Sequence, residues 1–534
     1  MATIYCASAS ATNLPVGSDS NDGLSISAPK LTLAAAFSAA GNGGIIYIDG
    51  LFDNATYTDN TNRNGITVDS YVAYSGIIRA GIGGARVFHI PSTGFGITLK
   101  KIVLDANNQQ TYCITCDSGI AVTTFTIDGT KLLNPVTAFI NAGIATSMTM
   151  LGNWIAQSNG AGVTSGVLSA NATAGTFNCG FGTFSMSGIT GTFLGFSGLP
   201  TVTGNSLIWH DIAYNVTGSS GATFSGGDVK GYPSVDIYNL SFNVAGISTV
   251  RAWWTKNHAT IPCTSCKVHG CTGSLGGTSG YLILIGDDVI TTANTISGAL
   301  VYGNNLSGAN HGYMFGFISD ARSWGNRGAD LVIGCLIKGD STTAGNMHTG
   351  NILERINTAA STSLYIKGAS GAGNVMANNT IIVSVGYVPD SILQVAADGA
   401  NNSANGQFYN NCIYSDVTVT KFVNVLTSQS ATFSNNSYYS TVALPANCFT
   451  YQASSYSTLV AWQAVEASAV ALLPAFLGYS SDYRLNTGSA LWRAGAYIAG
   501  TRDFRGRKFS VPPSIGAYEP SGGDPVQIAR TARA

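Results

Sequence analysis

Charged residues are unusually few in this sequence. Only 10% of the 534 residues are charged, with 25 Lys and Arg against 26 Asp and Glu. Three of the acids are glutamates, namely Glu354, Glu466 and Glu519. Because helical proteins cover their solvated faces with Glu, Lys and Arg, this composition excludes a mostly helical fold. The formal net charge of −1 and the lack of a Lys/Arg-rich run argue against a nucleic-acid partner.

A secretory signal and a long apolar run are also missing. The first basic side chain is Lys30, so the N-terminus lacks the basic start of a signal peptide. No window reaches the roughly 18 apolar residues of a membrane helix. The nearest window, 459–479, is interrupted by Glu466 and Pro474. We therefore expect synthesis in the cytoplasm without a signal peptide, and no membrane insertion.

Signals for a metal or a cofactor are weak. Cys113-x2-Cys116 and Cys263-x2-Cys266 have the internal spacing of zinc ligands, but the two pairs lie far apart in the sequence. The glycine-rich stretches lack the Lys-Ser/Thr of a phosphate loop. We therefore expect the ten cysteines to be buried or turn thiols, and we expect no metal and no cofactor.

Glycine and small polar residues are abundant instead. Sixty-five glycines, with many Ser, Thr and Asn, favour short strands joined by tight turns. At 45% hydrophobic the chain can bury a large core, which argues against wholesale disorder. The composition predicts an all-β protein.

A short pattern recurs in the second half of the chain. An aromatic or apolar residue precedes Asn-Asn, and apolar residues follow, with steps from the low twenties to the low thirties. This period is typical of one coil of a β-solenoid, in which a repeated turn Asn can stack into a hydrogen-bonded ladder. An array of β-sandwiches is the alternative. The copies are Asn304-Asn305, Asn378-Asn379, Asn410-Asn411 and Asn435-Asn436, with a degenerate copy at Gly334-Cys335.

The two ends of the chain differ from the middle. Residues 1–55 are expected to form an N-terminal cap, with a short helix near Pro29–Phe37 followed by a strand at 43–48. Residues 56–450 would form the β-helix. Residues 451–520 would form a C-terminal cap whose helix begins after Ser457, and 521–534 a flexible tail.

The motifs at both ends resemble the right-handed parallel β-helix repeat family, which includes pectate-lyase-like enzymes and bacteriophage tail-spike and appendage proteins. The resemblance implies a right-handed parallel β-helix with a short N-terminal helical cap and an α/β C-terminal cap. It does not choose a function, because lyases, hydrolases, adhesins and structural rods share this fold. The matching motifs include Gly17-Ser-Asp-Ser-Asn21-Asp22-Gly23, Leu459-x-x-Trp462-Gln463, Asp482-Tyr-Arg-Leu485 and Ile515-Gly-Ala-Tyr-Glu519.

Ionisable residues concentrate between His311 and Lys367, which makes this segment the first candidate site. Glycosidic cleavage needs two carboxylates, and Asp320, Asp330, Asp340 and Glu354 could supply them. Elimination from a uronic acid needs a base and a cation, and His311, Lys338, His348, Arg355 and Lys367 could serve. The alternative is that these residues lie on outer turns and solvate the rod. The catalytic candidates are Asp320, Asp340, Glu354, Arg355 and Lys338.

Polar-aromatic clusters form a second candidate site. Their spacing is close to whole numbers of coils, so they could share one face. Aromatic rings flanked by Asp, Arg and His suit sugar binding by stacking and bidentate hydrogen bonds. The alternative is that the rings fill the core or a loop base. The candidates are Trp209, His210, Asp211, Arg251, Trp253, Trp254, His311, Tyr313, Arg322 and Trp324.

The sequence and the resemblance together predict a bacteriophage virion protein, a β-helical spike, fibre or decoration subunit that contacts cell-surface polysaccharide. Such rods usually assemble as homotrimers with other virion proteins, although the coils could also stand alone. A polysaccharide lyase or glycoside hydrolase is the first alternative, and a non-catalytic structural rod is the second.

Overall fold

The computed structural model of the protein describes residues 2–53, 64–81, 86–90, 95–116, 124–143, 147–159, 162–169, 176–198, 206–258, 260–288, 296–356, 361–398, 404–479, 482–486 and 488–519. The chain divides into two compact units. The first comprises Met1–Leu300 and Asn305–Ser319, and the second comprises Val301–Asn304 and Asp320–Ala534. The division falls inside the stretch expected to be one β-helix.

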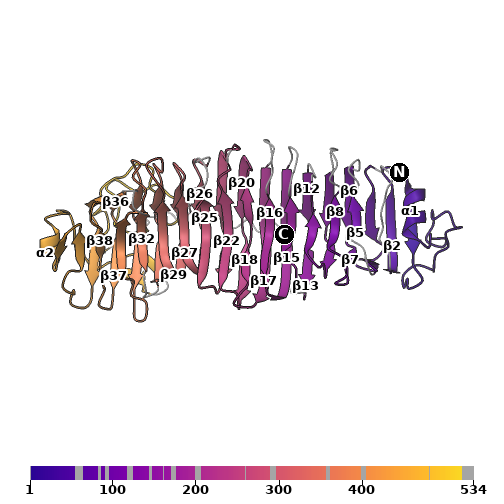
Figure 1. Cartoon of the computed structure of the whole chain (residues 1–534), viewed down its shortest axis with the longest axis horizontal. Coiled ribbons are helices and arrows are strands. Elements are labelled where there is room, and N and C mark those ends of the chain that lie inside the picture. Colours follow the sequence, from indigo (N-terminus) through magenta and orange to yellow (C-terminus); the bar gives the residue numbers. More distant parts are fainter. Residues whose placement is uncertain are drawn as a thin grey trace. The chain divides into compact units, whose positions relative to one another are not determined.

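The first unit is a parallel β-helix, as predicted. Its coils are read from three consecutive strands, β20 (Ser234–Tyr238), β21 (Ser241–Ala245) and β22 (Thr249–Lys256). Each pairs in parallel with the strand one coil later, namely β23 (Ser265–His269), β24 (Thr272–Ser274) and β25 (Ser279–Gly286). One coil therefore contributes one strand to each of three faces (Figure 1).

We number the faces by their strands. The first face carries β20 and β23, and the third carries β22, β25 and the second half of β27 (Asn305–Gly316), whose first residues pair with β24. The second face carries β21, β13 (Trp154–Ser158) and much of β15 (Thr176–Ile189). The long strand β17 (Ser206–Gly218) serves two faces, because its first half pairs with β20 and its second half with β21. The bend lies at Asp211, which has a left-handed φ of 50°.

Alternation along the strands fills the core of the first unit. β20 reads half-buried, buried, half-buried, buried, half-buried, as expected for a strand with one face inward. Rings stack from coil to coil inside, with Phe184 and Tyr214 centroids 5.3 Å apart and Tyr214 and Phe242 centroids 5.1 Å apart. This core fixes the register and so decides which residues face outward.

The second unit is also a parallel β-helix and contains the predicted asparagine ladder. Its strands β31 (Ile352–Ile356), β34 (Thr380–Val383), β37 (Cys412–Ser415) and β40 (Ser437–Ser440) pair in parallel. A buried Asn directly precedes each of these strands, and further Asn residues extend the column. The Nδ2 of each Asn donates to the Oδ1 of the Asn in the following coil. The members are Asn304, Asn326, Asn351, Asn379, Asn411 and Asn436, followed by Glu466.

The ladder confirms the predicted period and corrects two of its details. Successive members are 22, 25, 28, 32, 25 and 30 residues apart. In the pair Asn304-Asn305 the first residue is the member, whereas in the three later pairs it is the second. The degenerate copy at Cys335 is not a member, because Cys335 lies within β29 (Arg327–Lys338) and pairs with Leu364.

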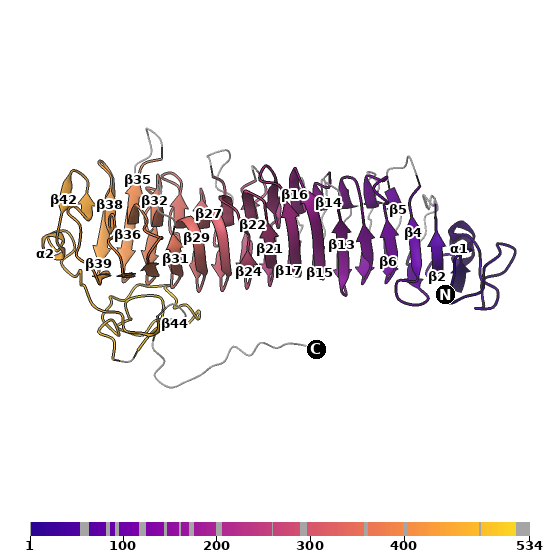
Figure 2. The ribbon, with the colours of Figure 1, turned by 90° about the horizontal axis from the view of Figure 1, so that it is seen from below.

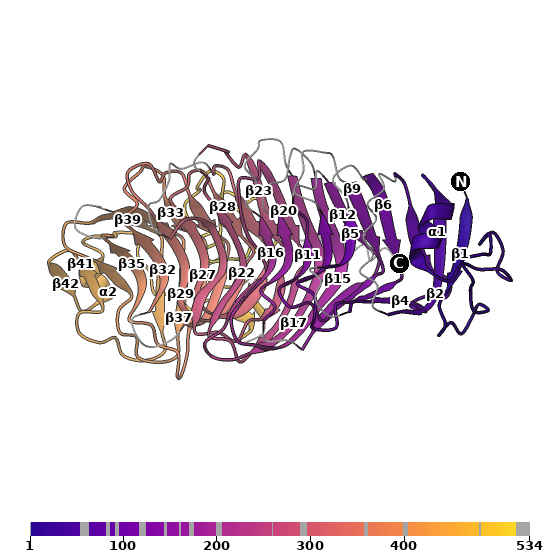
Figure 3. The same ribbon diagram turned by 45° about the vertical axis from the view of Figure 1, so that its right-hand side comes forward.

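The two helices of the described residues are short. α1 (Leu33–Ala40) confirms the predicted N-terminal helix, begins after the N-cap Thr32, and lies beside β1 (Thr3–Ala7) and β2 (Ile45–Phe52) (Figure 3). α2 (Leu459–Trp462) is capped by Thr458 rather than by Ser457, because the Thr458 hydroxyl accepts from the Ala461 N–H. Neither helix is long and apolar enough to cross a membrane.

After α2, residues 463–519 run back along the second unit (Figure 2). We call the described part of this stretch the C-terminal segment. Asn378 Nδ2 donates to the Ser514 carbonyl at 2.9 Å, and Asn410 Nδ2 donates to the Ala496 carbonyl at 2.7 Å. The hairpin of β43 (Phe476–Gly478) and β44 (Asp482–Leu485) belongs to it. The segment therefore covers the side of several coils of the second unit.

Candidate functional site

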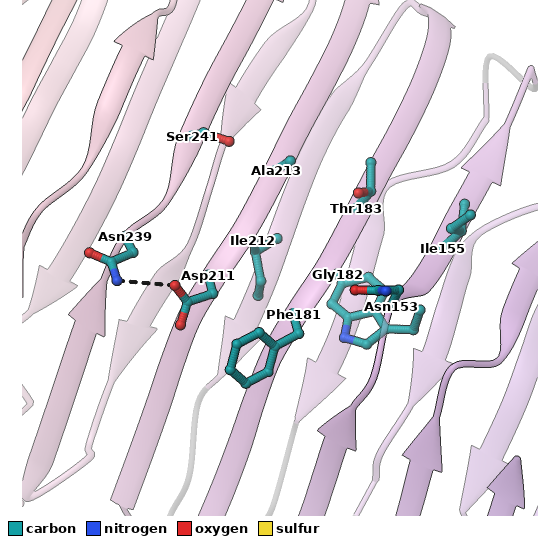
Figure 4. Close-up of a pocket in the computed structure, with 11 residues that line it drawn as sticks. Asn153, Ile155, Phe181, Gly182, Thr183, Asp211, Ile212, Ala213, Asn239 and Ser241 are labelled. Atoms are coloured by element: carbon teal, nitrogen blue, oxygen red, sulfur yellow. Dashed lines mark hydrogen bonds between the residues drawn. The ribbon is translucent and has the colours of Figure 1, made fainter. Parts of the chain in front are cut away.

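A surface hollow of about 480 Å³ opens on the second face of the first unit. We call it the Phe181 hollow. Ile155, Thr183, Ala213 and Ser241 occupy the same position on four neighbouring strands, so their side chains form one row across its floor (Figure 4). The further lining residues include Asn153, Phe181, Asp211 and Asn239.

The rim of the hollow is a column of left-handed residues. Phe181, Asp211 and Asn239 have φ values of 57°, 50° and 55°, and each sits where the chain turns from the first face to the second. This conformation turns their side chains outward, and the ring of Phe181 is 52% exposed. The column therefore presents an aromatic ring, a carboxylate and an amide to the hollow.

Asp211 is held by two hydrogen bonds. Its Oδ1 accepts from Asn239 Nδ2 at 3.0 Å (Figure 4), and its Oδ2 lies 2.7 Å from His210 Nδ1. His210 is itself buried and stacks on Tyr238 with centroids 4.7 Å apart, while Tyr238 stacks on His269 at 5.3 Å. Burial, followed by the charges of Asp211 and Asp236, raises the pKa of Tyr238 above its ordinary value. The carboxylate is thus oriented before any ligand arrives.

His210 is poorly placed to act on a ligand. Its Nδ1 is occupied by Asp211, its Nε2 lies 3.2 Å from Asn178 Oδ1, and its ring is packed between Tyr238 and Phe181. A general base needs a free nitrogen within hydrogen-bond reach of the substrate. His210 therefore orients the Asp211 carboxylate, and Asp211 is the group that faces the hollow.

A second hollow of about 390 Å³ continues along the same strands. Ser185, Asn215 and Asn243 form a row across it, two residues beyond the floor of the Phe181 hollow, and its lining reaches four residues beyond that floor at Ser187, Thr217 and Ala245. At about 3.3 Å per residue, the polar surface continues along the strands for roughly 13 Å. The described residues that line the second hollow include amides and hydroxyls and no charged group.

The predicted acidic candidate Glu354 is buried in a network of the second unit. Arg327 Nη2 lies 2.7 Å from Glu354 Oε1, and Tyr483 of the C-terminal segment donates to Oε2 at 2.8 Å. Arg355 contacts the same carboxylate at 3.4 Å and binds Asp330 through two hydrogen bonds of 2.8 and 2.9 Å. Asp330 strongly raises the pKa of Arg355, so the guanidinium stays charged. These residues tie the segment to the coils.

The other charged candidates have separate structural partners. Lys338 and Lys367 lie 3.6 and 3.1 Å from the carboxylate of Asp398. Asp340 accepts hydrogen bonds from the backbone and hydroxyl of Thr342 within a turn. Asp320 is exposed at a turn with φ of 55°. The structure therefore assigns local contacts to these residues, and their predicted catalytic role stays a prediction.

The histidines of that segment have different surroundings. His348 is buried beside Ser323, 2.6 Å from its hydroxyl, and burial lowers the pKa of His348 to about 3. A base that cannot reach solvent or substrate does not suit elimination. His311 belongs to the first unit and stacks on Tyr281 with centroids 4.9 Å apart.

Three aromatic candidates are corrected by the structure. Trp209, Trp253 and Tyr313 are at most 1% exposed and lie inside the coils. Their polar atoms are used internally, as when Trp209 Nε1 donates to the Tyr214 hydroxyl at 2.7 Å. The prediction that these rings stack on a sugar is wrong, because side chains alternate along each strand and these fall on the inward positions.

The remaining candidates do not share one face. His210 and Asp211 lie at the first face and its edge, whereas Arg251, Trp254 and His311 lie on the third. Arg322 and Trp324 belong to the second unit. There the Trp324 ring stacks on Tyr302 at 4.8 Å and has the Arg502 guanidinium 5.4 Å from its centroid.

All ten cysteines are free and buried, as expected for structural thiols. Cys113 and Cys266 donate to the Leu133 carbonyl and the Thr255 hydroxyl at 3.4 and 3.8 Å. The described residues contain no group of three or more His, Cys, Asp or Glu side chains placed to hold a metal ion.

Sequence reasoning missed Phe181, Asn239 and Thr183. A signal for two of them exists. Tyr238-Asn239-Leu240 is a single-Asn version of the repeated pattern, and Phe181 stands alone between Gly180 and Gly182. The repeat is defined by Asn pairs, so it does not include turns that carry a single left-handed residue with another side chain.

No protein-family model and no curated protein sequence matches the chain. Among solved structures, the chain is similar to three carbohydrate-active proteins. They are the GH136 lacto-N-biosidase from Eubacterium ramulus (11% identity, 82% of this chain and 67% of that chain, TM-score 0.27), pectate lyase Pel9A (13%, 98%, 97%, 0.26) and the A-module of mannuronan C-5 epimerase AlgE6 from Azotobacter vinelandii (11%, 82%, 94%, 0.30). At such TM-scores the likeness carries nothing about the chemistry of this chain, which has to come from its own side chains.

Proposed function

We propose that the protein binds carbohydrate at the Phe181 hollow, as a β-helical subunit of the kind expected for a virion appendage. The observation that carries the proposal is the lining of the hollow. An exposed aromatic ring stands beside a pre-oriented carboxylate, with amides and hydroxyls across the floor. Sugars present apolar C–H faces and hydroxyl edges, which this combination complements.

Binding is favoured over glycoside hydrolysis by the count of carboxylates. Hydrolysis by the usual route needs two carboxyl groups on either side of the scissile bond. Among the described residues that line the hollow, Asp211 supplies one and no second is present. Asp211 also has fixed partners in Asn239 and His210, which suits a hydrogen-bond acceptor.

The first test is binding to a panel of capsule and lipopolysaccharide preparations, measured by affinity electrophoresis and titration calorimetry. Phe181→Ala removes the stacking ring and should weaken binding about tenfold. Asp211→Asn keeps the shape and should weaken it severalfold. The control is Tyr497→Ala, which removes a ring that is 60% exposed in the second unit. Equal binding by wild type, Phe181→Ala and Asp211→Asn would refute the proposal.

A depolymerase assay on the same glycans separates binding from catalysis. Reducing ends report hydrolysis, and ultraviolet absorbance of unsaturated sugars reports elimination. We expect neither product. Product formation would favour the lyase or hydrolase alternative and would direct mutation to Asp320, Asp340 and Glu354 or to His311, Lys338 and Arg355. The homotrimer and the virion partners stay predictions, and sedimentation of the purified protein tests the first.

A further inference from the structure

Arg251 on the third face of the first unit is a cation with no ion-pair partner among the described residues. The residue is half-buried on β22, opposite Tyr281 of β25. Within the described part of the chain its guanidinium makes no hydrogen bond and no ion pair, and its Nε is buried without a partner. A cation withdrawn from water in this way is costly unless an anion meets it.

The ring of Trp254 holds Arg251 in position. The guanidinium carbon lies 4.7 Å from the ring centroid, within the range of a cation–π contact. The ring itself is fixed, since Trp254 Nε1 donates to the Gly286 carbonyl at 2.8 Å. Arg251 therefore presents its free nitrogens from a pre-organised position, which lowers the cost of binding a ligand.

A second cation, Lys256, contacts the Trp254 ring. Lys256 Nζ lies 4.0 Å from the Trp254 centroid and 2.8 Å from Asp228. Lys230 pairs with Lys256 in register on the neighbouring strand and makes no ion pair among the described residues. Burial, followed by the charge of Lys230, lowers the pKa of nearby His258 below its ordinary value. Lys230 and Lys256 thus add two cations to the surface that carries Arg251.

The carboxylates with described partners here are already engaged. Asp228 is paired with Lys256, and Asp288 accepts a hydrogen bond from the Tyr281 hydroxyl. Burial, together with that hydrogen bond and the charge of Asp288, strongly raises the pKa of Tyr281, so the phenol stays neutral. A neutral Tyr281 cannot itself serve as the counter-ion of Arg251.

We propose that this third-face surface, made of Arg251, Trp254, Lys256 and Lys230, binds an oxyanion group carried by a polysaccharide. A carboxylate or sulfate presents two oxygens that match the fork of a guanidinium, and flanking lysines add charge without fixed geometry. The inference is independent of the proposed function, because the Phe181 hollow lies on another face and shares none of these residues.

The experiment compares three polymers with the full-length protein by titration calorimetry. They are dextran sulfate, polygalacturonate and neutral dextran. Arg251→Gln should weaken binding of a charged polymer about tenfold. Lys230→Gln should weaken it severalfold, and added salt should weaken it further. Binding of one charged polymer and not the other identifies the oxyanion, and neutral dextran should not compete.

Two controls keep the proposal falsifiable. Lys267→Gln removes a half-buried cation from the first face of the same unit and should change binding less than twofold. Tyr497→Ala removes an exposed ring from the second unit and should leave binding of the charged polymers unchanged. Equal weakening by Arg251→Gln and Lys267→Gln would mean unspecific attraction and would overturn the proposal. Loss of charged-polymer binding in Tyr497→Ala, or no binding to either charged polymer by the folded wild type, would also overturn it.

Discussion

The same turn is built in opposite ways in the two units. In each, a left-handed residue ends one strand and the next residue points inward. In the first unit that inward residue is apolar, as with Ile212 after Asp211 and Leu240 after Asn239. In the second unit it is Asn, as with Asn351 after Gly350.

The outer sides of the turns differ as well. The Asp211 turn borders an open hollow, whereas the Asn378 and Asn410 turns donate to carbonyls of the C-terminal segment. In the second unit the turn is therefore satisfied on both sides by the chain itself. In the first unit Asn239 donates to Asp211, and both side chains border the open hollow. The closed turn adds contacts within the chain, whereas the open turn leaves the surface on which the proposed binding site rests.

Removing Glu466 should break the second unit most severely. This residue is 1% exposed and ends the ladder by accepting from Asn436 N and Nδ2, Tyr438 Oη and Trp462 Nε1. Glu466→Ala leaves those donors buried and unpaired, so we expect the free energy of unfolding to fall by about 3–5 kcal/mol. Urea unfolding followed by tryptophan fluorescence measures it. A loss below about 1 kcal/mol would contradict the ladder's structural role.

Glu466→Gln isolates the charge of the same group. Burial raises the pKa of Glu466 above its ordinary 4.5. The folded protein then keeps a proton that the unfolded chain has lost, so the stability from this group is present below about pH 4.5 and is lost as the pH rises through the raised pKa. Between pH 4.5 and the raised pKa, the free energy of unfolding of the wild type should therefore fall relative to that of Glu466→Gln. A constant difference across that interval would contradict the raised pKa.

A glycine-to-alanine substitution at a turn tests how closely the C-terminal segment packs on the second unit. A Cβ added at Gly350 would overlap the Arg502 carbonyl oxygen, whereas one at Gly129 meets Lys101 Cγ at 3.5 Å. Both glycines are left-handed, so each alanine costs roughly 1 kcal/mol in backbone strain. Gly350→Ala should cost about 1–3 kcal/mol more, because the segment must move. Thermal unfolding of both variants measures the difference, and equal melting temperatures would show that the segment is not tightly seated.

Asn379→Ala should have a smaller effect in the middle of the ladder. The amide nitrogen of Asn351 donates to Asn379 Oδ1 at 3.1 Å and would lose its acceptor, as would the Asn351 backbone N–H. We expect a loss of about 2–3 kcal/mol in the free energy of unfolding. The control is Asn239→Ala on the open turn of the first unit, expected to cost about 1 kcal/mol because the alanine must keep a left-handed φ. Similar losses in both variants would erase the distinction between the units.

Most of the fold was predictable because its causes are local. Alternating burial, turn residues and the spacing of Asn378-Asn379 and later pairs act within one coil, and a repeated coil has few ways to stack. The helix at α1 was predicted from its alanine-rich sequence for the same reason. The extent of the ladder was only partly predictable, since Asn326 and Asn351 follow a glycine rather than a second asparagine.

The candidate site was half predictable. Trp253 and Trp254 are neighbours with the same sequence signal, yet one is buried and the other faces outward. Alternation requires that such neighbours differ, but the register that chooses between them comes from the coils on either side. Glu354 is a plausible catalytic acid from the sequence alone, because its partner Tyr483 lies 129 residues away and their contact cannot be predicted from local sequence.

The sequence by itself determined that the chain is an all-β solenoid poor in charge, because strand alternation, turn chemistry and coil period are properties of short segments. Tertiary structure decided which of its polar and aromatic side chains reach the surface. Phe181, Asp211 and Asn239 line one hollow, and Arg251 meets Trp254 with no ion-pair partner in the described part of the chain, only because coils stack in a fixed register. A site of this kind combines residues from several coils, and no single coil's sequence contains it.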